Sequence, residues 1–208
     1  MNVIVYIDGY NFFIAMKHKK SPEWQNLNEI DLVKLSQKYI EKYDRNATLV
    51  KVKLFMAIPH NNLNYKMENF QEYIGRHLSA YPSQFQFIKG RLTDQSRQCH
   101  HCCQEIKWRT EKLTDVNLSV EMVHDALTAD VDAMYLISAD SDFESPIKLS
   151  YKSYKKSILL IIPPSLSSYG LYKFCKKQKE YSSESQQDHQ IRMVRMNKHF
   201  PLVQQSQF

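Results

Sequence analysis

Four aspartates of this sequence stand where a fold could gather them for metal chemistry. Asp8 follows the apolar run VIVYI, and Asp140 and Asp142 stand just past the apolar run AMYLI. Asp115 opens the stretch DVNLSVEM, whose apolar residues recur at helical spacing. Carboxylates that lie together repel one another, so such a cluster is costly unless a cation lies among them. Their oxygens suit Mg²⁺ or Mn²⁺, and a divalent ion held in this way can activate water for attack on a phosphate.

The elements that must position these aspartates alternate between strands and helices. Short apolar runs predict strands at residues 3–7, 48–58, 85–88, 133–137 and 157–162. Helical spacing predicts helices near residues 29–43, 62–80 and 115–128. Such alternation indicates a mostly parallel sheet, in which ligands bind beyond the carboxyl ends of the strands. One aspartate after a strand is often only a turn residue or a helix cap, but three segments here bring carboxylates toward one edge.

Two local features complete this expectation. Asn28 is the predicted N-cap of the helix near 29–43, with Asp31 at its third helical position. Residues 90–112 follow neither the helical nor the strand period, so an irregular segment is expected there.

Composition limits the class of protein. The chain has 208 residues, 43% of them hydrophobic, with 28 basic and 22 acidic side chains and a net charge of +6. This length suggests one domain with an appendage, and the hydrophobic content excludes global disorder. No apolar run approaches the ~20 residues of a membrane span, and no signal peptide is recognised, so a cytoplasmic protein without a membrane partner is expected. The body is expected at residues 1–180, and residues 181–208, rich in Gln, Ser and His, form an extension that is partly ordered or docked.

The cysteines suggest a second metal. Cys99 and Cys102 are spaced like half of a zinc site, within a segment expected as a knuckle at residues 97–104. The missing ligands could come from His100 or His101, from distant Cys175, or from a second subunit, which would make the protein a homo-oligomer. Free or redox-active thiols remain the alternative.

Three motifs together resemble the NYN domain, the LabA-like branch of the PIN-type ribonuclease superfamily. They are VYIDGYN, EKLTDVNLSVEM and LISADSDFESPI, in this order. The resemblance implies a PIN-like three-layer α/β/α sandwich with a central, mostly parallel sheet, an acidic Mg²⁺ or Mn²⁺ site and cleavage of RNA phosphodiesters. One departure is Ala139, which stands where the family has glycine; alanine would be strained there if the position needs a positive φ.

Matching the motifs residue by residue assigns the roles that the resemblance implies. The catalytic set is Asp8, Asp115, Asp140 and Asp142, and the first three of these would bind the metal. Asn11 and Ser138 would support them. Glu121 matches a further family acid, but six residues turn a regular helix by ~240°, so it does not share a face with Asp115.

Lysines provide candidate contacts to RNA. Lys112 precedes Asp115, and Lys152, Lys155 and Lys156 lie among tyrosines later in the chain. Phosphate contacts combined with aromatic stacking suit single-stranded RNA, although a solvated basic face would have the same composition. The predicted function is therefore a metal-dependent ribonuclease acting on single-stranded or structured RNA. A catalytically silent RNA-binding module, DNA cleavage and, less favoured, an aspartyl-nucleophile phosphatase are the alternatives.

Overall fold

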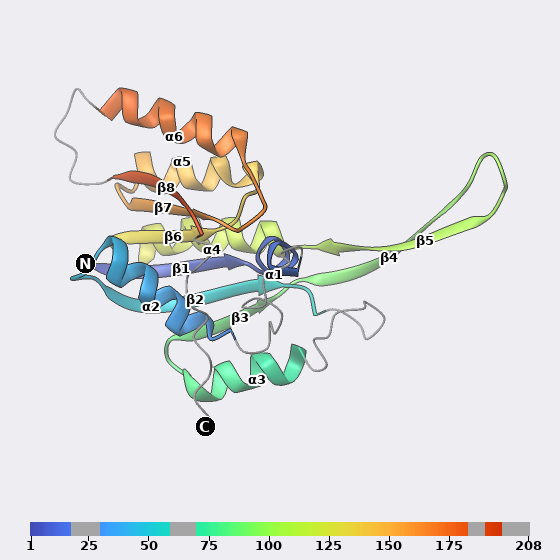
Figure 1. The fold of residues 1–208 in the computed structure, drawn as a ribbon, viewed down its shortest axis with the longest axis horizontal. Coiled ribbons are helices and arrows are strands. Elements are labelled where there is room, and N and C mark those ends of the chain that lie inside the picture. Colours follow the sequence, from blue (N-terminus) through green and yellow to red (C-terminus); the bar gives the residue numbers. More distant parts are fainter. Residues whose placement is uncertain (18–29, 59–69, 183–189, 197–208) are drawn as a thin grey trace.

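A computed structural model of the chain describes residues 1–17, 30–58, 70–182 and 190–196 (Figure 1). Its centre is a sheet of six strands in the order β3-β2-β1-β6-β7-β8, and every neighbouring pair is parallel. The strands are β1 (Asn2–Asp8), β2 (Thr48–Met56), β3 (Phe85–Lys89), β6 (Ala133–Ile137), β7 (Ser157–Ile162) and β8 (Ile191–Arg195). The predicted parallel sheet and its five predicted strands are confirmed.

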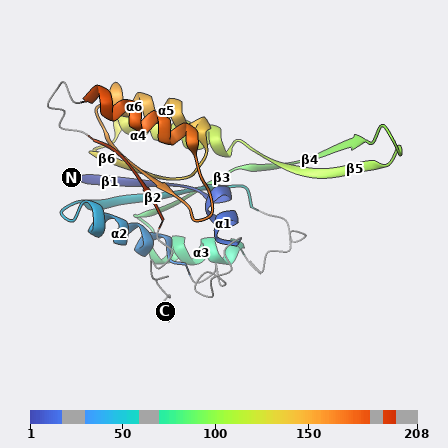
Figure 2. The ribbon, with the colours of Figure 1, turned by 45° about the horizontal axis from the view of Figure 1, so that its top comes forward.

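Helices cover both faces of this sheet. One face carries α1 (Gly9–Lys17), α2 (Leu32–Tyr43) and α3 (Phe70–Ala80), and the other carries α4 (Thr114–Thr128), α5 (Glu144–Lys152) and α6 (Tyr169–Ser182) (Figure 2). Side chains alternate along the strands, so Val3, Val5 and Ile7 of β1 face the first helical layer, whereas Ile4 and Tyr6 face the second. The result is the expected PIN-like α/β/α sandwich with a hydrophobic core on each side of the sheet.

The start of α2 differs from the expected one. Asp31 is the N-cap, and its side chain accepts hydrogen bonds from the backbone N–H groups of Val33 and Lys34. Tyr81 also donates its hydroxyl to Asp31, at 2.6 Å. The cap therefore lies later than predicted because the carboxylate of Asp31 satisfies the free amides of the first turn. Asn28, the predicted cap, and residues 62–69 of the predicted second helix lie outside the described residues.

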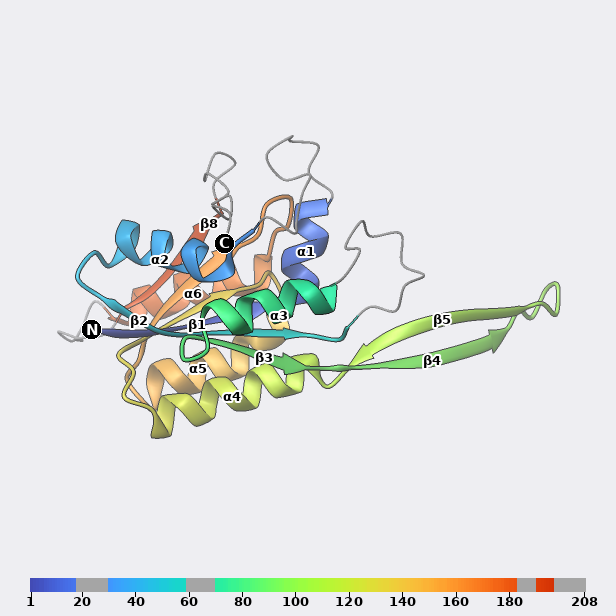
Figure 3. The same ribbon diagram turned by 90° about the horizontal axis from the view of Figure 1, so that it is seen from below.

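Residues 90–112 form a hairpin, so the prediction of an irregular segment was wrong. Strands β4 (Arg91–Gln98) and β5 (Glu105–Lys112) pair only with each other, antiparallel, and project from the body (Figure 3). Both strands are largely exposed to solvent. β4 lacks an alternation of apolar and polar residues, whereas in β5 Ile106 and Trp108 alternate with Lys107 and Arg109, and the prediction overlooked this signal.

The C-terminal extension contributes to the sheet through β8, which pairs with β7 at one edge. Arg192 of this strand forms an ion pair with Asp44 and donates to the carbonyl oxygen of Tyr43, so β8 also contacts the end of α2. Within the described part of the chain, no helix is both long and apolar enough to cross a bilayer.

Candidate active site

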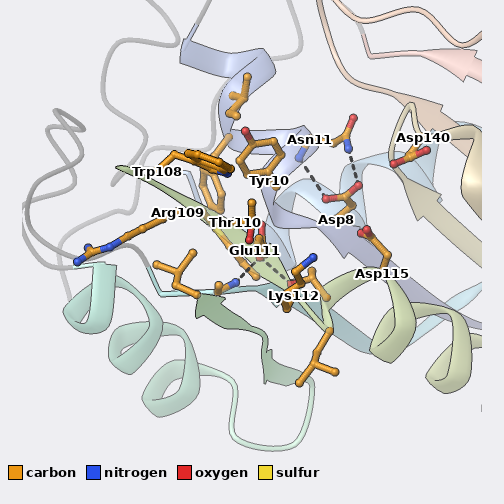
Figure 4. Close-up of a pocket in the computed structure, with 17 residues that line it drawn as sticks. Asp8, Tyr10, Asn11, Trp108, Arg109, Thr110, Glu111, Lys112, Asp115 and Asp140 are labelled. Atoms are coloured by element: carbon orange, nitrogen blue, oxygen red, sulfur yellow. Dashed lines mark hydrogen bonds between the residues drawn. The ribbon is translucent and has the colours of Figure 1, made fainter. Parts of the chain in front are cut away.

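Asp8 lies where β1 ends at the carboxyl edge of the sheet, directly beside the end of β6. It caps α1 by accepting a hydrogen bond from the backbone N–H of Asn11, at 3.1 Å. The Asn11 side chain donates to Asp8 Oδ2 at 2.7 Å (Figure 4). The Ser138 hydroxyl donates to the same oxygen at 2.8 Å. The two predicted supporting residues therefore both hold Asp8 in place.

The close packing around Asp8 explains why glycine follows it. A Cβ atom on Gly9 would lie 2.7 Å from Cβ of Met56 and 2.9 Å from the carbonyl oxygen of Phe55. Gly9 thus lets α1 begin against β2 immediately after the strand end.

Burial makes the Asp8 carboxyl a weak acid. Asp8 is only 1% exposed. Desolvation raises the pKa of Asp8 to about 6, although the hydrogen bonds from Asn11 and Ser138 act to lower it. The negative charge of Asp115 adds to the rise. A carboxylate desolvated to this degree and facing another acid is a position that a cation would stabilise.

Asp140 and Asp142 follow β6 across the same edge. Asp140 accepts a hydrogen bond from the backbone N–H of Asp142, at 2.9 Å, and so caps the short 3₁₀ turn Ser141–Phe143. The backbone N–H of Asp140 donates to Ser138 Oγ at 3.0 Å, so one hydroxyl links Asp140 to Asp8. Ala139 does not have a positive φ, and its replacement of the family glycine therefore costs no backbone strain.

Asp115 lies in the first turn of α4 and faces the same acids. Its side chain is exposed, yet neighbouring atoms partly desolvate the carboxyl and raise its pKa, and the charges of Asp140, Glu111 and Asp142 raise it further. Asp8, Asp115, Asp140 and Asp142 were predicted from the sequence, and Glu111 was not. Glu111 accepts hydrogen bonds from the Thr114 hydroxyl and from the backbone N–H of Ala57. Its position within the EKLTDV motif, four residues before Asp115, was the signal that could have identified it.

The donors at this edge suit a hard divalent cation in their chemistry, because they are carboxylate and amide oxygens. In the described ranges, however, no three His, Cys, Asp or Glu side chains stand close enough together to hold a metal ion as arranged. Asp115 and Asp142 are exposed and Asp140 is half-buried, so their side chains have room to turn toward an ion.

A cavity of about 870 Å³ opens beside the acids (Figure 4). Asp8, Asn11, Asp115 and Asp140 line one side of it. The remaining lining comes from α1, the end of β2 and the base of the hairpin, and includes Tyr10, Phe13, Ile14, Met56, Leu92, Trp108, Arg109, Glu111 and Lys112. The hairpin is thus part of the site, and Tyr10 and Trp108 are lining residues that the sequence reasoning missed.

Glu121 has a different set of contacts. Its carboxylate accepts from Lys53 Nζ at 2.6 Å, and the same ammonium pairs with Asp125 at 2.7 Å. Asp125 also accepts from the Tyr6 hydroxyl at 2.7 Å. Glu121 therefore belongs to a partly buried ion-pair network between α4 and the sheet, as expected from its rotation away from Asp115 on the helix.

The candidate RNA-binding lysines are divided between two edges of the sheet. Lys112 lines the cavity. Lys152 ends α5 and Lys155 precedes β7, whereas Lys156 donates to the carbonyl oxygen of Val131 just before β6. The last three lie at the amino ends of the strands, opposite the edge that carries Asp8.

The predicted knuckle residues form the tip of the hairpin. The backbone N–H groups of Cys102 and His101 donate to the Cys99 thiol, and with the Cys102 side chain they lower the pKa of Cys99. Cys103 closes the turn with a φ of 55° and donates to the carbonyl oxygen of Cys99. Cys175 is buried on α6 in the core of the body, so the structure does not bring it to the tip.

Comparison with known proteins gives three findings. The model of the NYN domain matches residues 2–181. A 6-hydroxy-3-succinoylpyridine 3-monooxygenase of Pseudomonas putida is 22% identical over 77% of this chain, which spans only 59% of that protein. A crystallised protein of unknown function from Vibrio parahaemolyticus superposes with a TM-score of 0.54 at 17% identity, over 95% of this chain and 93% of the other, and supports the fold alone.

Proposed function

Because this chain belongs to the NYN domain family of PIN-like nucleases, we propose that it hydrolyses RNA phosphodiester bonds with Mg²⁺ or Mn²⁺. The observation that carries the proposal is the convergence of acids from three segments. Asp8, Asp115 and Asp140 line one cavity, where the charge of Asp115 raises the pKa of Asp8 and the charge of Asp140 raises the pKa of Asp115. A module that only binds RNA would gain nothing from acids that repel both one another and the phosphate backbone.

Asp8, Asp115 and Asp140 would hold the ion. When bound, such an ion lowers the pKa of water and offsets charge on the leaving oxygen. Asn11 and Ser138 fix the orientation of Asp8 through their hydrogen bonds. Asp142 is exposed beside Asp140, to which its backbone N–H donates, and it would orient the attacking water.

The reaction forms one bond and breaks another. The water oxygen bonds to phosphorus and releases one proton, the ester bond to the leaving oxygen breaks, and that oxygen takes up one proton from the solvent, so the protons balance. Lys112 lines the same cavity and would bind a non-bridging oxygen of the phosphate, which also keeps the RNA near the acids.

The test compares matched substitutions of aspartate by asparagine. Labelled RNA and DNA are incubated with Mn²⁺, Mg²⁺ or EDTA and wild-type protein, Asp140→Asn or Asp130→Asn. Asp130 is an exposed acid near the amino end of β6 that accepts from the Asn2 side chain, so it serves as the control. Metal-dependent cleavage of RNA that is lost only in Asp140→Asn supports the proposal. RNA binding without cleavage in either metal would instead support the silent RNA-binding module.

Binding of a small aromatic heterocycle is the second candidate. The Pseudomonas relative is named for a pyridine substrate, and the cavity here has an apolar side with two exposed aromatic residues, Tyr10 and Trp108. Calorimetric titration with a hydroxypyridine and with a nucleotide distinguishes the two occupants.

We also propose that the hairpin tip binds zinc together with a second copy of the chain. Cys99 and Cys102 offer two thiols, and a structural zinc site needs four ligands. The hairpin carries these thiols away from the body, so another tip is the natural source of the missing pair (Figure 3). One zinc ion would then join two subunits.

A further inference from the structure

The cavity has two chemically different sides. Carboxylates occupy one side, whereas the side formed by α1, β2 and the hairpin base includes Ile14, Met56 and Leu92. A nucleotide is divided in the same way, because its phosphate needs cationic partners and its base is a flat, largely uncharged ring. The carboxylates can bind a phosphate only when a cation lies between them and the phosphate. The apolar side can contact the base directly.

Two large aromatic side chains stand exposed on that apolar side. Trp108 of β5 is 42% exposed and Tyr10 of α1 is 54% exposed, and both line the cavity. In Figure 4 they lie together on the side away from Asp140. Exposed aromatic surface in a cleft beside polar groups is typical of a ligand-binding site.

The position of Trp108 is fixed by the hairpin. Trp108 pairs in register with Gln95 near the middle of the hairpin, and β5 continues from there through Leu113 into α4. A Cβ atom on Gly90 would lie 2.2 Å from the Thr114 hydroxyl, so β3 and β4 join in tight contact with the start of α4. Trp108 and Asp115 therefore lie on one continuous segment, residues 90–115. Gly90 and Thr114, near its two ends, are in close contact with each other.

Charge around Trp108 agrees with a nucleic-acid ligand. Arg109 and Lys112 line the cavity on the same strand, between Trp108 and Asp115. Arg109 Nε pairs with Asp94 at 2.6 Å, which leaves its two terminal amino groups for a phosphate. They provide the cations that phosphates on either side of a bound base require. Stacking on an aromatic ring accepts any base, so this arrangement predicts little sequence preference.

We propose that Trp108, with Tyr10 beside it, stacks on an unpaired base next to the scissile phosphate, which makes single-stranded RNA the substrate class. The inference rests on the proposed function, because it places the base relative to the acids. A base in a duplex is already stacked and paired, so it must leave the helix to reach the ring. Single-stranded RNA avoids that cost.

The fluorescence of Trp108 is used to test the proposal. Trp24 is replaced by Phe in all proteins, because it is the other of the two tryptophans in the sequence. Fluorescence is titrated in EDTA, which prevents metal-dependent cleavage, with a short single-stranded RNA, the same RNA lacking one base, a duplex, and a free hydroxypyridine. Quenching by the single strand, with weaker binding of the duplex and the abasic strand, is expected.

Affinity of variants is measured separately by anisotropy of labelled RNA. Trp108→Ala should weaken binding by roughly 5- to 150-fold, the range for loss of one stacked base, and Trp108→Phe should keep most of the affinity. Ile106→Ala, an exposed residue of the same strand, should leave it unchanged. Circular dichroism verifies that each variant is folded.

The outcomes separate this inference from the proposed function. If RNA is cleaved normally by Trp108→Ala, with unchanged affinity, the stacking role is overturned while the nuclease stands. If Trp108 is needed for single-strand binding but no metal supports cleavage, stacking stands and the nuclease fails. Equal affinity for intact and abasic RNA, or quenching only by the free hydroxypyridine, would refute an RNA base as the ligand.

Discussion

Replacing Asp8 by asparagine should stabilise the metal-free protein, even though it removes a proposed metal ligand. The folded pKa of Asp8 is about 6, against 3.8 for the ordinary carboxyl. Each unit of such a difference corresponds to 1.36 kcal/mol, so keeping Asp8 ionised in the fold costs about 3 kcal/mol at high pH. An uncharged amide avoids this cost.

The sign follows from proton binding. Between pH 3.8 and about 6 the folded protein holds a proton on Asp8 that the unfolded chain has lost, so wild-type stability falls as the pH rises through this window. Above it, the full penalty is present. Asp8→Asn should therefore match wild type near the bottom of the window and exceed it by up to about 3 kcal/mol above pH ~7.

The amide can also be accommodated in the hydrogen-bond network. Its oxygen can accept from the backbone N–H of Asn11, as Asp8 Oδ1 does. Its NH₂ group can donate to the Ser138 hydroxyl oxygen, or to the Asn11 side chain once that amide is turned over. The Ser138 hydroxyl loses Asp8 Oδ2 as its acceptor, and this loss of about 1 kcal/mol offsets part of the predicted gain without reversing its sign.

Urea unfolding in EDTA across this pH range measures the difference, with Asp130→Asn as the matched control. Adding Mg²⁺ should raise the stability of wild type more than that of Asp8→Asn, because a ligand that binds only the folded state stabilises it. A variant less stable than wild type above pH ~7, or a difference that does not change with pH, would show that burial of charge at Asp8 has been misjudged.

Three further predictions concern the surroundings of the site. Leu113 adopts a left-handed φ of 72° at the start of α4, so Leu113→Gly should relieve about 1 kcal/mol of strain and raise the thermal midpoint in a calorimetric scan. Lys53→Met should lower the free energy of unfolding by about 3 kcal/mol in urea titration, because it leaves Asp125 and Glu121 without their shared cation; an unchanged midpoint would refute that role. Protein purified without chelator should contain one zinc ion per two chains by elemental analysis, and Cys99→Ser should lose both the zinc and the dimer in light scattering; a zinc-free wild type would favour free thiols.

The placement of the acids at one edge of the sheet could be predicted from the sequence, because their chain positions follow the ends of neighbouring strands. Asp8 and Asp140 directly follow buried strands, and parallel neighbours bring their carboxyl ends together. The same reasoning could not place Lys152, Lys155 and Lys156. Their number is visible in the sequence, but only the path of α5 and β7 shows that they lie at the other edge.

The aromatic side of the cavity was missed for a related reason. Tyr10 and Trp108 come from segments far apart in sequence, and their meeting depends on the hairpin. Ile106 and Trp108 of β5 alternate with Lys107 and Arg109, but β4 has only Leu92 as an apolar residue. The pattern of one short strand without a matching pattern in its partner does not predict a hairpin.

The two-stranded hairpin also has an outer edge on each side. Because β4 and β5 pair only with each other, the outward backbone groups of both strands are open to another strand, and such edges promote association of chains. Charged side chains are frequent along both strands, with Arg91, Asp94 and Arg97 on one and Glu105, Lys107 and Arg109 on the other. Adding a strand from another molecule would crowd or desolvate these charges. These charges protect the hairpin from edge-to-edge aggregation along its length. Its tip remains the point at which a second molecule can make specific contact.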